Sequence, residues 1–350
     1  ALETHVNSTL HFPGSQAGSI YSASTVQASY YHTCAVLDNG SAKCWGEGQV
    51  GMLGTGDNND RRTPTQVLLG WQSGTPSLAT EVGQGSGSGG HHTCTIMIDG
   101  TIQCWGEDFS GQIGHGGNSG WHTTPYPVFM PQGKTAVQVS NGGHHTCAIM
   151  DDHSLYCWGE NSEGIVGVGE SGTDVVTPYP ISLPAGRTAV AVSTGWKNSC
   201  VILDDGTGMC WGLNTVGQVG DGTTTDRDEP TPITILPTSS TLAAIAIGGG
   251  GGTGATNGGE SGTTTCALLN NGSVACWGKN DVGQFGDGTT TSSTSPRYAL
   301  LPPGRTAMMR LSLSISGCVG DAALELDKGC YWRPSHTPVF QDGLKSPLTM

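Results

Sequence analysis

The sequence predicts an all-β fold built from repeated units, because cysteine pairs, hairpin turns and glycines all recur along it in register. The chain has 350 residues, and its 12 cysteines fall into six close pairs. Nine residues separate the cysteines of the first five pairs and Trp-Gly follows the second cysteine, whereas the sixth pair is two residues longer. The pairs are Cys34/Cys44, Cys94/Cys104, Cys147/Cys157, Cys200/Cys210, Cys266/Cys276 and Cys318/Cys330.

Each cysteine pair is predicted to bracket a β-hairpin. Between Cys34 and Cys44, apolar residues flank an Asp-Asn-Gly turn, and a three-residue loop centred on Asn39 puts the two cysteines directly opposite each other. Opposed cysteines on neighbouring strands are close enough to bridge. We therefore expect six disulfides within hairpins and an oxidising compartment. Zinc ligation and free buried thiols fit this spacing less well, since zinc sites usually pair cysteines about two to four residues apart.

The repeat extends to both sides of the hairpin. Glycines recur in register after each Trp-Gly, and an alternating strand pattern such as that of residues 136–140 precedes the hairpin. A Pro-containing segment such as 124–131 is expected to begin each unit. In the third hairpin His153 stands where the others have Gly, so its tip should be strained or rearranged. The repeat units are approximately 6–58, 59–118, 119–171, 172–224, 225–290 and 291–340.

The strands carry bulky apolar residues on both faces, which favours stacked sheets. Val36 lies on the same face as the cysteine, whereas Leu37 and Trp45 lie on the other face. Such strands must be covered on both sides, and the blades of a β-propeller satisfy this requirement. The tryptophans that follow each second cysteine should then be buried between adjacent blades. They are Trp45, Trp105, Trp158, Trp211 and Trp277.

The recurring pattern His-Thr-Cys-Ala, a Gly turn, then Cys-Trp-Gly-x-Asn-x-x-Gly-Gln-x-Gly-Asp-Gly resembles the regulator of chromosome condensation repeat in its cysteine-containing form. The resemblance covers about residues 20–333 and implies a propeller with four-stranded blades. We expect one domain over residues 1–350 with six blades, seven being the alternative. The sixth unit is degenerate, because Cys330 is followed by Tyr-Trp-Arg. Residues 337–340 resemble the start of a further unit.

Composition narrows the class of protein. Glycine accounts for 57 residues and only 12% of residues are charged, which suits one large all-β domain. The net charge of −14 disfavours nucleic acid and anionic lipid as partners. No run of 18 apolar residues is present, so we expect no membrane insertion. Because the chain begins with Ala1 and is rich in paired cysteines, we expect a mature secreted protein, extracellular or at the cell surface.

Three kinds of candidate site were considered. His32, His92 and His145 hold one repeat position and suggest a metal ring, but Asn198 and Thr264 interrupt it, so packing is the preferred interpretation. Two acidic loops, Asp57–Asp60 and Asp221–Asp228, are candidates for calcium. Glycosylation sequons begin at Asn7, Asn39 and Asn271. No catalytic motif was found, and we expect no enzyme activity and no other cofactor.

The sequence favours a protein that works by contact. We expect a non-enzymatic extracellular propeller that acts as a structural or self-assembling component of a surface, appendage or filament, with copies of itself as partners and sugars as covalent additions. Its atypical ends, residues 1–20 and 334–350, are candidates for chain-to-chain contact. The alternative is a secreted protein-binding module of inhibitor type, since the resemblance includes secreted inhibitors.

Overall fold

The computed structural model describes residues 22–307 except residue 30 and the segments 73–74, 84–89, 119, 235–239, 249–262 and 303–305. All described residues belong to one of the two compact units of the chain, Ala1–Ser314. The Cys318/Cys330 pair, the sequon at Asn7 and the terminal segments that were expected to mediate assembly lie outside the described residues.

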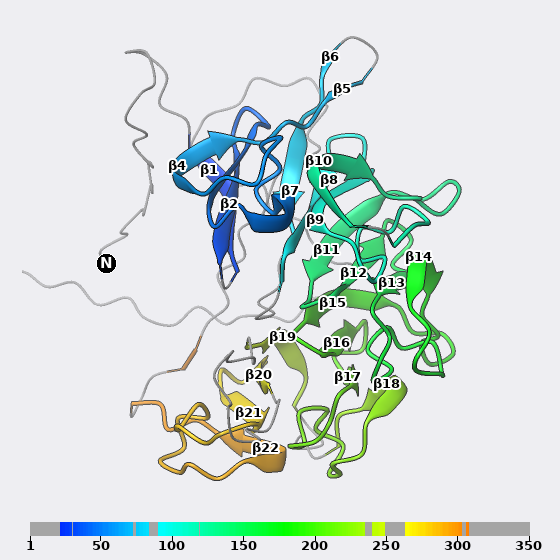
Figure 1. The fold of residues 1–350 in the computed structure, drawn as a ribbon. Coiled ribbons are helices and arrows are strands. Elements are labelled where there is room, and N and C mark those ends of the chain that lie inside the picture. Colours follow the sequence, from blue (N-terminus) through cyan, green and yellow to red (C-terminus); the bar gives the residue numbers. More distant parts are fainter. Residues whose placement is uncertain are drawn as a thin grey trace, which may run out of the picture. The chain divides into compact units, whose positions relative to one another are not determined.

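The described residues form an all-β, propeller-like fold of five four-stranded antiparallel sheets (Figure 1). The strands of sheet 1 are β1 (Ala23–Ala28), β2 (His32–Leu37), β3 (Ala42–Gly46) and β4 (Arg61–Gln66). Those of sheet 2 are β7 (Ala79–Val82), β8 (His92–Met97), β9 (Ile102–Glu107) and β10 (Trp121–Pro127). Sheet 3 contains β11 (Ala136–Asn141), β12 (His145–Met150), β13 (Leu155–Gly159) and β14 (Val175–Pro180).

Sheets 4 and 5 repeat the same strand order. Sheet 4 contains β15 (Ala189–Thr194), β16 (Asn198–Leu203), β17 (Gly208–Gly212) and β18 (Arg227–Pro232). Sheet 5 contains β19 (Leu242–Ile247), β20 (Thr264–Leu269), β21 (Val274–Gly278) and β22 (Ser293–Tyr298). A small ribbon of β5 (Trp71–Gln72) and β6 (Thr75–Pro76) joins the first two sheets, and the only helix in the described chain is the single turn η1 (Gln49–Gly51). None of the described segments is a helix with the length and apolar character needed to cross a membrane.

The central hairpin of each sheet has the register expected from the cysteine spacing, with the two cysteines directly opposite each other. The Cα atoms of the paired cysteines lie 4.0–4.1 Å apart, and all five pairs form disulfides. Disulfides within the hairpins are therefore confirmed for the five described sheets. The structure joins Cys34 with Cys44, Cys94 with Cys104, Cys147 with Cys157, Cys200 with Cys210, and Cys266 with Cys276.

The hairpin tips explain how His153 is accommodated. The glycine at this position has a positive φ in the other hairpins, for example +75° at Gly40. His153 takes the same left-handed conformation, with φ of 63°, and donates its backbone N–H to Met150 as Gly40 does to Leu37. The tip is therefore strained rather than rearranged, because a side chain is disfavoured in this region.

The Pro-containing segments form the outermost strand of the sheet that precedes them. Residues 124–127 lie in β10, which pairs with β9 of the second hairpin. The expectation that such segments begin the next unit is therefore wrong, and each sheet straddles two of the approximate repeat units. The physical reason is that a strand at a sheet edge tolerates proline, which has no N–H to donate to a further strand. Residues 337–340, which were expected to resemble the start of a further unit, lie outside the described residues.

The hydrophobic core consists of layers between successive sheets. One layer contains Ile149 and Leu155 of sheet 3 together with Val201 and Leu203 of sheet 4. Equivalent clusters join sheets 1 and 2, sheets 2 and 3, and sheets 4 and 5. Burial of both faces of each sheet explains why its strands are apolar on both sides.

Candidate functional site

A repeated pair of hydrogen bonds, which we call the lock, joins each sheet to the next. The indole N–H of the tryptophan in one sheet donates to a backbone carbonyl in the loop of the preceding sheet. A Thr or Ser hydroxyl of the same sheet donates to the same carbonyl oxygen. The indole bonds are Trp105 to Met52 (2.9 Å), Trp158 to Gln112 (3.0 Å), Trp211 to Ile165 (3.0 Å) and Trp277 to Gln218 (3.0 Å). The hydroxyl donors are Thr93, Thr146, Ser199 and Thr265.

Glycines in the receiving loops make room for the indole rings. A Cβ atom at Gly114 would lie 2.6 Å from Nε1 of Trp158, and Gly114 also has φ of +80°. The four tryptophans of the lock are completely buried, as expected from the sequence. Trp45 is only partly buried, contrary to the expectation for all five. It belongs to sheet 1, and no earlier sheet is present among the described residues to cover it.

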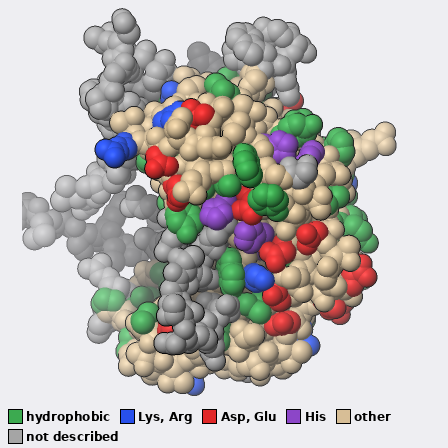
Figure 2. All heavy atoms as spheres, in the orientation of Figure 1, with side chains coloured by type: hydrophobic (Ala, Val, Ile, Leu, Met, Phe, Trp, Pro, Cys, Tyr) green, Lys and Arg blue, Asp and Glu red, His purple; other side chains and the backbone are tan. Residues whose placement is uncertain are grey.

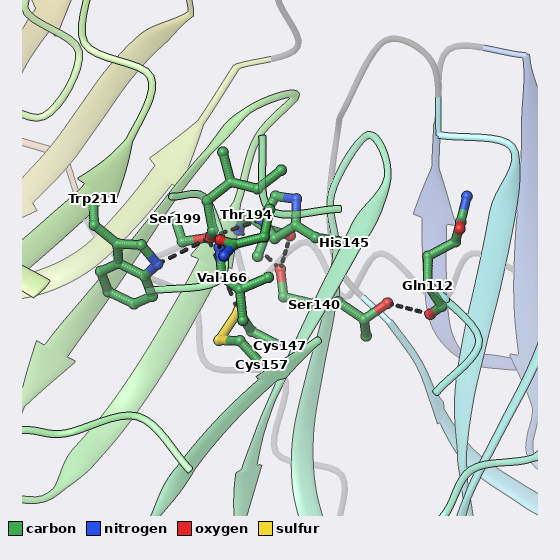
Figure 3. Close-up of a disulfide and its surroundings, with 12 residues drawn as sticks. Gln112, Ser140, His145, Cys147, Cys157, Val166, Thr194, Ser199 and Trp211 are labelled. Atoms are coloured by element: carbon green, nitrogen blue, oxygen red, sulfur yellow. Dashed lines mark hydrogen bonds between the residues drawn. A yellow bond between two sulfur atoms is a disulfide. The ribbon is translucent and has the colours of Figure 1, made fainter. Parts of the chain in front are cut away.

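The histidines of the repeat extend the lock by one bond. Nε2 of His145 lies 2.8 Å from the Ser199 hydroxyl, between sheets 3 and 4 (Figure 3). The single hydroxyl proton of Ser199 is donated to Ile165, so His145 must carry its own proton on Nε2 and donate it. His32 and His92 bind Thr93 and Thr146 in the same way, at 2.7 and 2.9 Å.

Burial keeps these three histidines neutral. It lowers the pKa of His32 and of His145 to about 4, and it lowers the pKa of His92 well below its usual value. Each imidazole bonds the neighbouring sheet, and among the described residues the three do not come together as metal ligands. The packing interpretation of these histidines is the one that fits their geometry.

The two acidic loops that were candidates for calcium are built as turns with an internal ion pair. Asp57 accepts two bonds from Arg61, at 3.0 and 2.7 Å, and these bonds help to lower the pKa of Asp57 to about 2. Asp221 accepts from Nε of Arg227 at 2.7 Å and from the Thr223 backbone at 2.9 Å. Calcium binding at these loops stays a prediction.

Two of the three sequons lie in the described part of the chain. Asn39 and Asn271 are exposed at hairpin tips. The side-chain oxygen of each accepts a bond from the backbone N–H two residues later, at 3.0 Å for Ser41 and 2.9 Å for Ser273. The turn thus uses the amide oxygen and leaves the amide nitrogen outward, and glycosylation stays a prediction.

A second group of side chains lies beside the lock but is partly exposed. We call it the hairpin-base surface, and its members come from sheets 1 to 4. They are Tyr31, His91, Glu107, His144, Glu160, Glu163, Trp196 and Lys197. Figure 2 shows histidine, acidic and hydrophobic side chains side by side near the middle of the face in view.

One backbone hydrogen bond per sheet positions this surface. In sheet 2 the backbone N–H of Glu107 donates to the backbone carbonyl of His91 at 2.9 Å, and in sheet 3 the backbone N–H of Glu160 donates to that of His144 at 2.9 Å. In each sheet the acceptor lies just before the second strand, and the donor lies two residues after the tryptophan. The side chains of these two residues therefore emerge together at the base of the hairpin. Tyr31, Lys197 and Thr263 hold the first of these positions in the other sheets.

Side-chain contacts connect the hairpin-base surface across sheets. Glu107 lies 2.8 Å from Nδ1 of His91 in its own sheet and 3.8 Å from Nδ1 of His144 in the next. The Tyr31 and His91 rings approach to 5.3 Å between centroids. The side-chain type thus differs from sheet to sheet at this position, whereas the backbone hydrogen bond that places it is the same.

Lys197 continues the surface from sheet 4 to sheet 3. Its ammonium lies 2.8 Å from Glu163 and 3.4 Å from Glu160, and 5.3 Å from the centroid of the Trp196 ring. Of the side chains on the hairpin-base surface, Tyr31 and Trp196 are of the aromatic kind that is enriched at protein interfaces, whereas Glu and Lys are depleted there. His91 and His144 each precede a packed histidine in the sequence, but neither was predicted to be a site residue. The contact of His144 with Glu107 depends on how sheets 2 and 3 pack.

Family comparisons agree with this architecture. Two models of the regulator of chromosome condensation (RCC1) repeat match the chain. One matches residues 24–51, 136–165, 189–218 and 261–284, and the other matches 99–149, 152–202 and 205–252. The chain belongs to the RCC1-repeat family.

Among curated relatives of this RCC1-repeat chain, the Ultraviolet-B receptor UVR8 of Arabidopsis thaliana is 33% identical over 205 residues. That match covers 59% of this chain and 44% of the receptor. The human E3 ubiquitin-protein ligase HERC2 is 30% identical over 207 residues, covering 59% of this chain and 4% of the ligase. The chain therefore matches less than half the length of each of these relatives.

Solved structures share the fold. Prp20p of Saccharomyces cerevisiae matches with a TM-score of 0.66 and 18% identity, over 81% of this chain and 64% of that one. Human WBSCR16 matches with a TM-score of 0.67 and 18% identity, over 85% of this chain and 74% of that one. At this level of identity the likeness shows the propeller fold alone.

Proposed function

We propose that this RCC1-repeat propeller is a non-enzymatic, extracellular protein-binding module whose partner docks on the hairpin-base surface. The observation that carries the proposal is the contact chain from Tyr31 through His91, Glu107 and His144. It places partly exposed groups of different chemistry at equivalent positions of successive sheets. The four tryptophans of the lock and the histidines His32, His92 and His145, by contrast, are buried.

Two further observations support an extracellular binding role. Five disulfides within hairpins are typical of proteins that fold outside the reducing cytosol. Among solved relatives, the yeast protein Prp20p is described with binding to Gsp1p and histones in one structure and with Kap60 bound in another. The net charge of −14 and the glutamates of the hairpin-base surface favour a partner with a basic contact surface.

The test compares two variants for capture of a partner from the extracellular fluid of the source organism. The His91→Ala/His144→Ala double variant removes the centre of the surface, while Val282→Ser changes an exposed loop residue of sheet 5. The parent and Val282→Ser should capture the same protein, and the double variant should lose it by at least about tenfold, which is 1.4 kcal/mol. Equal capture by all three would contradict the proposed surface, provided that all three melt cooperatively.

A structural, self-assembling role is the second candidate, and the two end sheets favour it. In sheets 1 to 4 a glycine of the loop, such as Gly220, receives the tryptophan of the next sheet. At Gly286 of sheet 5 the nearest described atom to an added Cβ is Ala299 Cβ at 3.7 Å, and none of the described tryptophans contacts it. Sheet 1 presents the partly exposed Trp45, which holds the repeat position of the tryptophans that contact these glycines in the other sheets.

Light scattering during size-exclusion chromatography distinguishes the two candidates. Assembly through the ends requires oligomers that weaken when residues 334–350 are deleted. A monomer that the deletion leaves monomeric would exclude assembly and leave the binding module.

A further inference from the structure

Asp108 occupies a position that is asparagine in the next three sheets. In those sheets the side-chain oxygen accepts the N–H of the residue five positions later, as Asn214 does from Val219 at 2.9 Å. The side-chain nitrogen donates to carbonyls of the same loop, as Asn214 does to Thr225 at 2.9 Å. Asn161 and Asn280 make the equivalent bonds. The asparagine side chain thus stabilises the loop with both its oxygen and its nitrogen.

A carboxylate can fulfil only half of this role. Oδ1 of Asp108 accepts the N–H of Ile113 at 2.9 Å, as in the other sheets. Oδ2 has no proton to donate to the loop carbonyls. Asp108 is completely buried, and Oδ2 has no hydrogen-bond partner in the described structure. A buried carboxylate oxygen without a donor is costly, so this position calls for a positive group.

Two imidazoles face that oxygen, His115 from the loop after β9 and His122 from β10. Nδ1 of His115 lies 3.1 Å and Nε2 of His122 lies 3.6 Å from Oδ2 of Asp108. The three ligand atoms lie within 4.8 Å of one another, and neither imidazole nitrogen has a hydrogen-bond partner among the described residues. Figure 2 shows histidines in a second group on this face, apart from the central one.

The surroundings hold both imidazoles in place. The Tyr126 ring packs against His115 and His122 at centroid distances of 4.9 and 4.8 Å. Gly117 leaves room for His115, because a Cβ there would lie 2.7 Å from its Nε2. The side chains of His115 and His122 are 15% and 21% exposed, whereas the three atoms that face one another are buried.

We propose that Asp108, His115 and His122 form a binding site for one divalent transition-metal ion of the zinc class. Two imidazoles and one carboxylate are a ligand set for such ions, whereas Ca²⁺ and Mg²⁺ prefer oxygen alone. Tetrahedral zinc with bonds of about 2.0–2.1 Å sets its ligand atoms about 3.4 Å apart, which small side-chain rotations would reach from the present spacing.

The donor atoms suit the site. A neutral imidazole keeps its proton on one ring nitrogen and can bind a metal ion through the other. A bound cation supplies the positive charge that the buried Oδ2 lacks. This site is independent of the hairpin-base surface and of the proposed partner.

The sharpest test is Asp108→Asn, which restores the residue that three other sheets use. We would dialyse the parent and the variant against Zn²⁺ and measure bound metal per chain, then repeat with Co²⁺ and record its absorption spectrum. The parent should bind one ion per chain, with a spectrum typical of nitrogen and oxygen ligands. Asp108→Asn should bind at least about 100-fold more weakly, beyond the range for loss of a second-shell partner.

Two controls keep the result interpretable. His91→Ala/His144→Ala removes two other partly exposed histidines and should leave metal binding unchanged. Zn²⁺ should raise the melting temperature of the parent but not that of Asp108→Asn, while the variant without metal should melt no lower than the parent. The proposal is overturned if the parent binds no stoichiometric metal, if Asp108→Asn binds as tightly as the parent, or if the control double variant loses the metal equally.

Discussion

Replacing Trp158 with alanine tests whether the lock between sheets holds this propeller together. Trp158 is completely buried and donates its indole N–H to the Gln112 carbonyl at 3.0 Å. Removing a buried tryptophan typically costs about 3–5 kcal/mol of unfolding free energy. The Gln112 carbonyl keeps its bond from Thr146, so no buried acceptor is left without a partner. Most of the loss should therefore come from lost packing against Gly114 and the layer between sheets 2 and 3.

Two further variants separate packing from hydrogen bonding. Trp158→Phe retains most of the apolar contact and loses the N–H bond, so it should cost about 1–2 kcal/mol. Trp45→Ala, at the partly exposed end, should cost clearly less than Trp158→Ala because less area is buried there.

Urea unfolding followed by circular dichroism, with the disulfides kept oxidised, measures all three variants. The reasoning is refuted if Trp158→Ala costs below about 1 kcal/mol, the range of surface substitutions, or if Trp45→Ala costs as much.

Other measurements test the cysteines and the buried histidines. Non-reducing peptide mapping should recover six local disulfides, including Cys318–Cys330, and a bridge between different units would contradict the register argument. Burial lowers the pKa of His145 to about 4, so this histidine binds a proton more readily in the unfolded chain than in the folded one. The stability that it contributes is therefore fully present above about pH 6.5 and is lost as the pH falls toward 4. Between pH 7 and pH 5 the loss in unfolding free energy should be about 2 kcal/mol. In His145→Gln an amide N–H that does not titrate reaches toward Ser199 instead. In urea unfolding at pH 7 and pH 5, the unfolding free energy of this variant should therefore fall by about 2 kcal/mol less than that of the parent. An equal loss in both proteins would count against burial as the cause.

Local sequence was enough for the hairpins, because their information lies within a few residues. The nine-residue spacing and the Asp-Asn-Gly turn determine the register of Cys34 and Cys44, and the structure confirms it. The same register recurs at Cys104, Cys157, Cys210 and Cys276, each opposite the first cysteine of its own hairpin.

The same locality explains the wrong assignment of the Pro-containing segments. Whether residues 124–127 pair backward or forward depends on which sheet offers a free edge, and that edge is formed by residues distant in the sequence. The structure pairs them backward, with β9 of the preceding hairpin.

The candidate sites depended more strongly on tertiary structure. The sequence ranked packing above metal binding for His32, His92 and His145, but the Thr and Ser hydroxyls that they bind come from the next sheet. The group of Asp108, His115 and His122 was not predicted from the sequence. A signal was present, since Asp108 stands where the following copies have asparagine. Its meaning required the fold, because only the folded chain brings His115 of the loop and His122 of β10 to Oδ2 of Asp108. Asparagine would have a donor nitrogen in place of that oxygen.

What the sequence determined by itself was the repeat, the disulfides within hairpins and the all-β class, because turn chemistry and strand alternation act over short distances. What the tertiary structure decided was which repeated residues are buried and which remain accessible. His92 is enclosed by sheet 3, whereas its neighbour His91 reaches the hairpin-base surface beside Glu107. The two are adjacent in sequence, but His92 is the first residue of β8, which is buried at every position, whereas His91 lies just before the strand. The packing of the next sheet then determines the role of each.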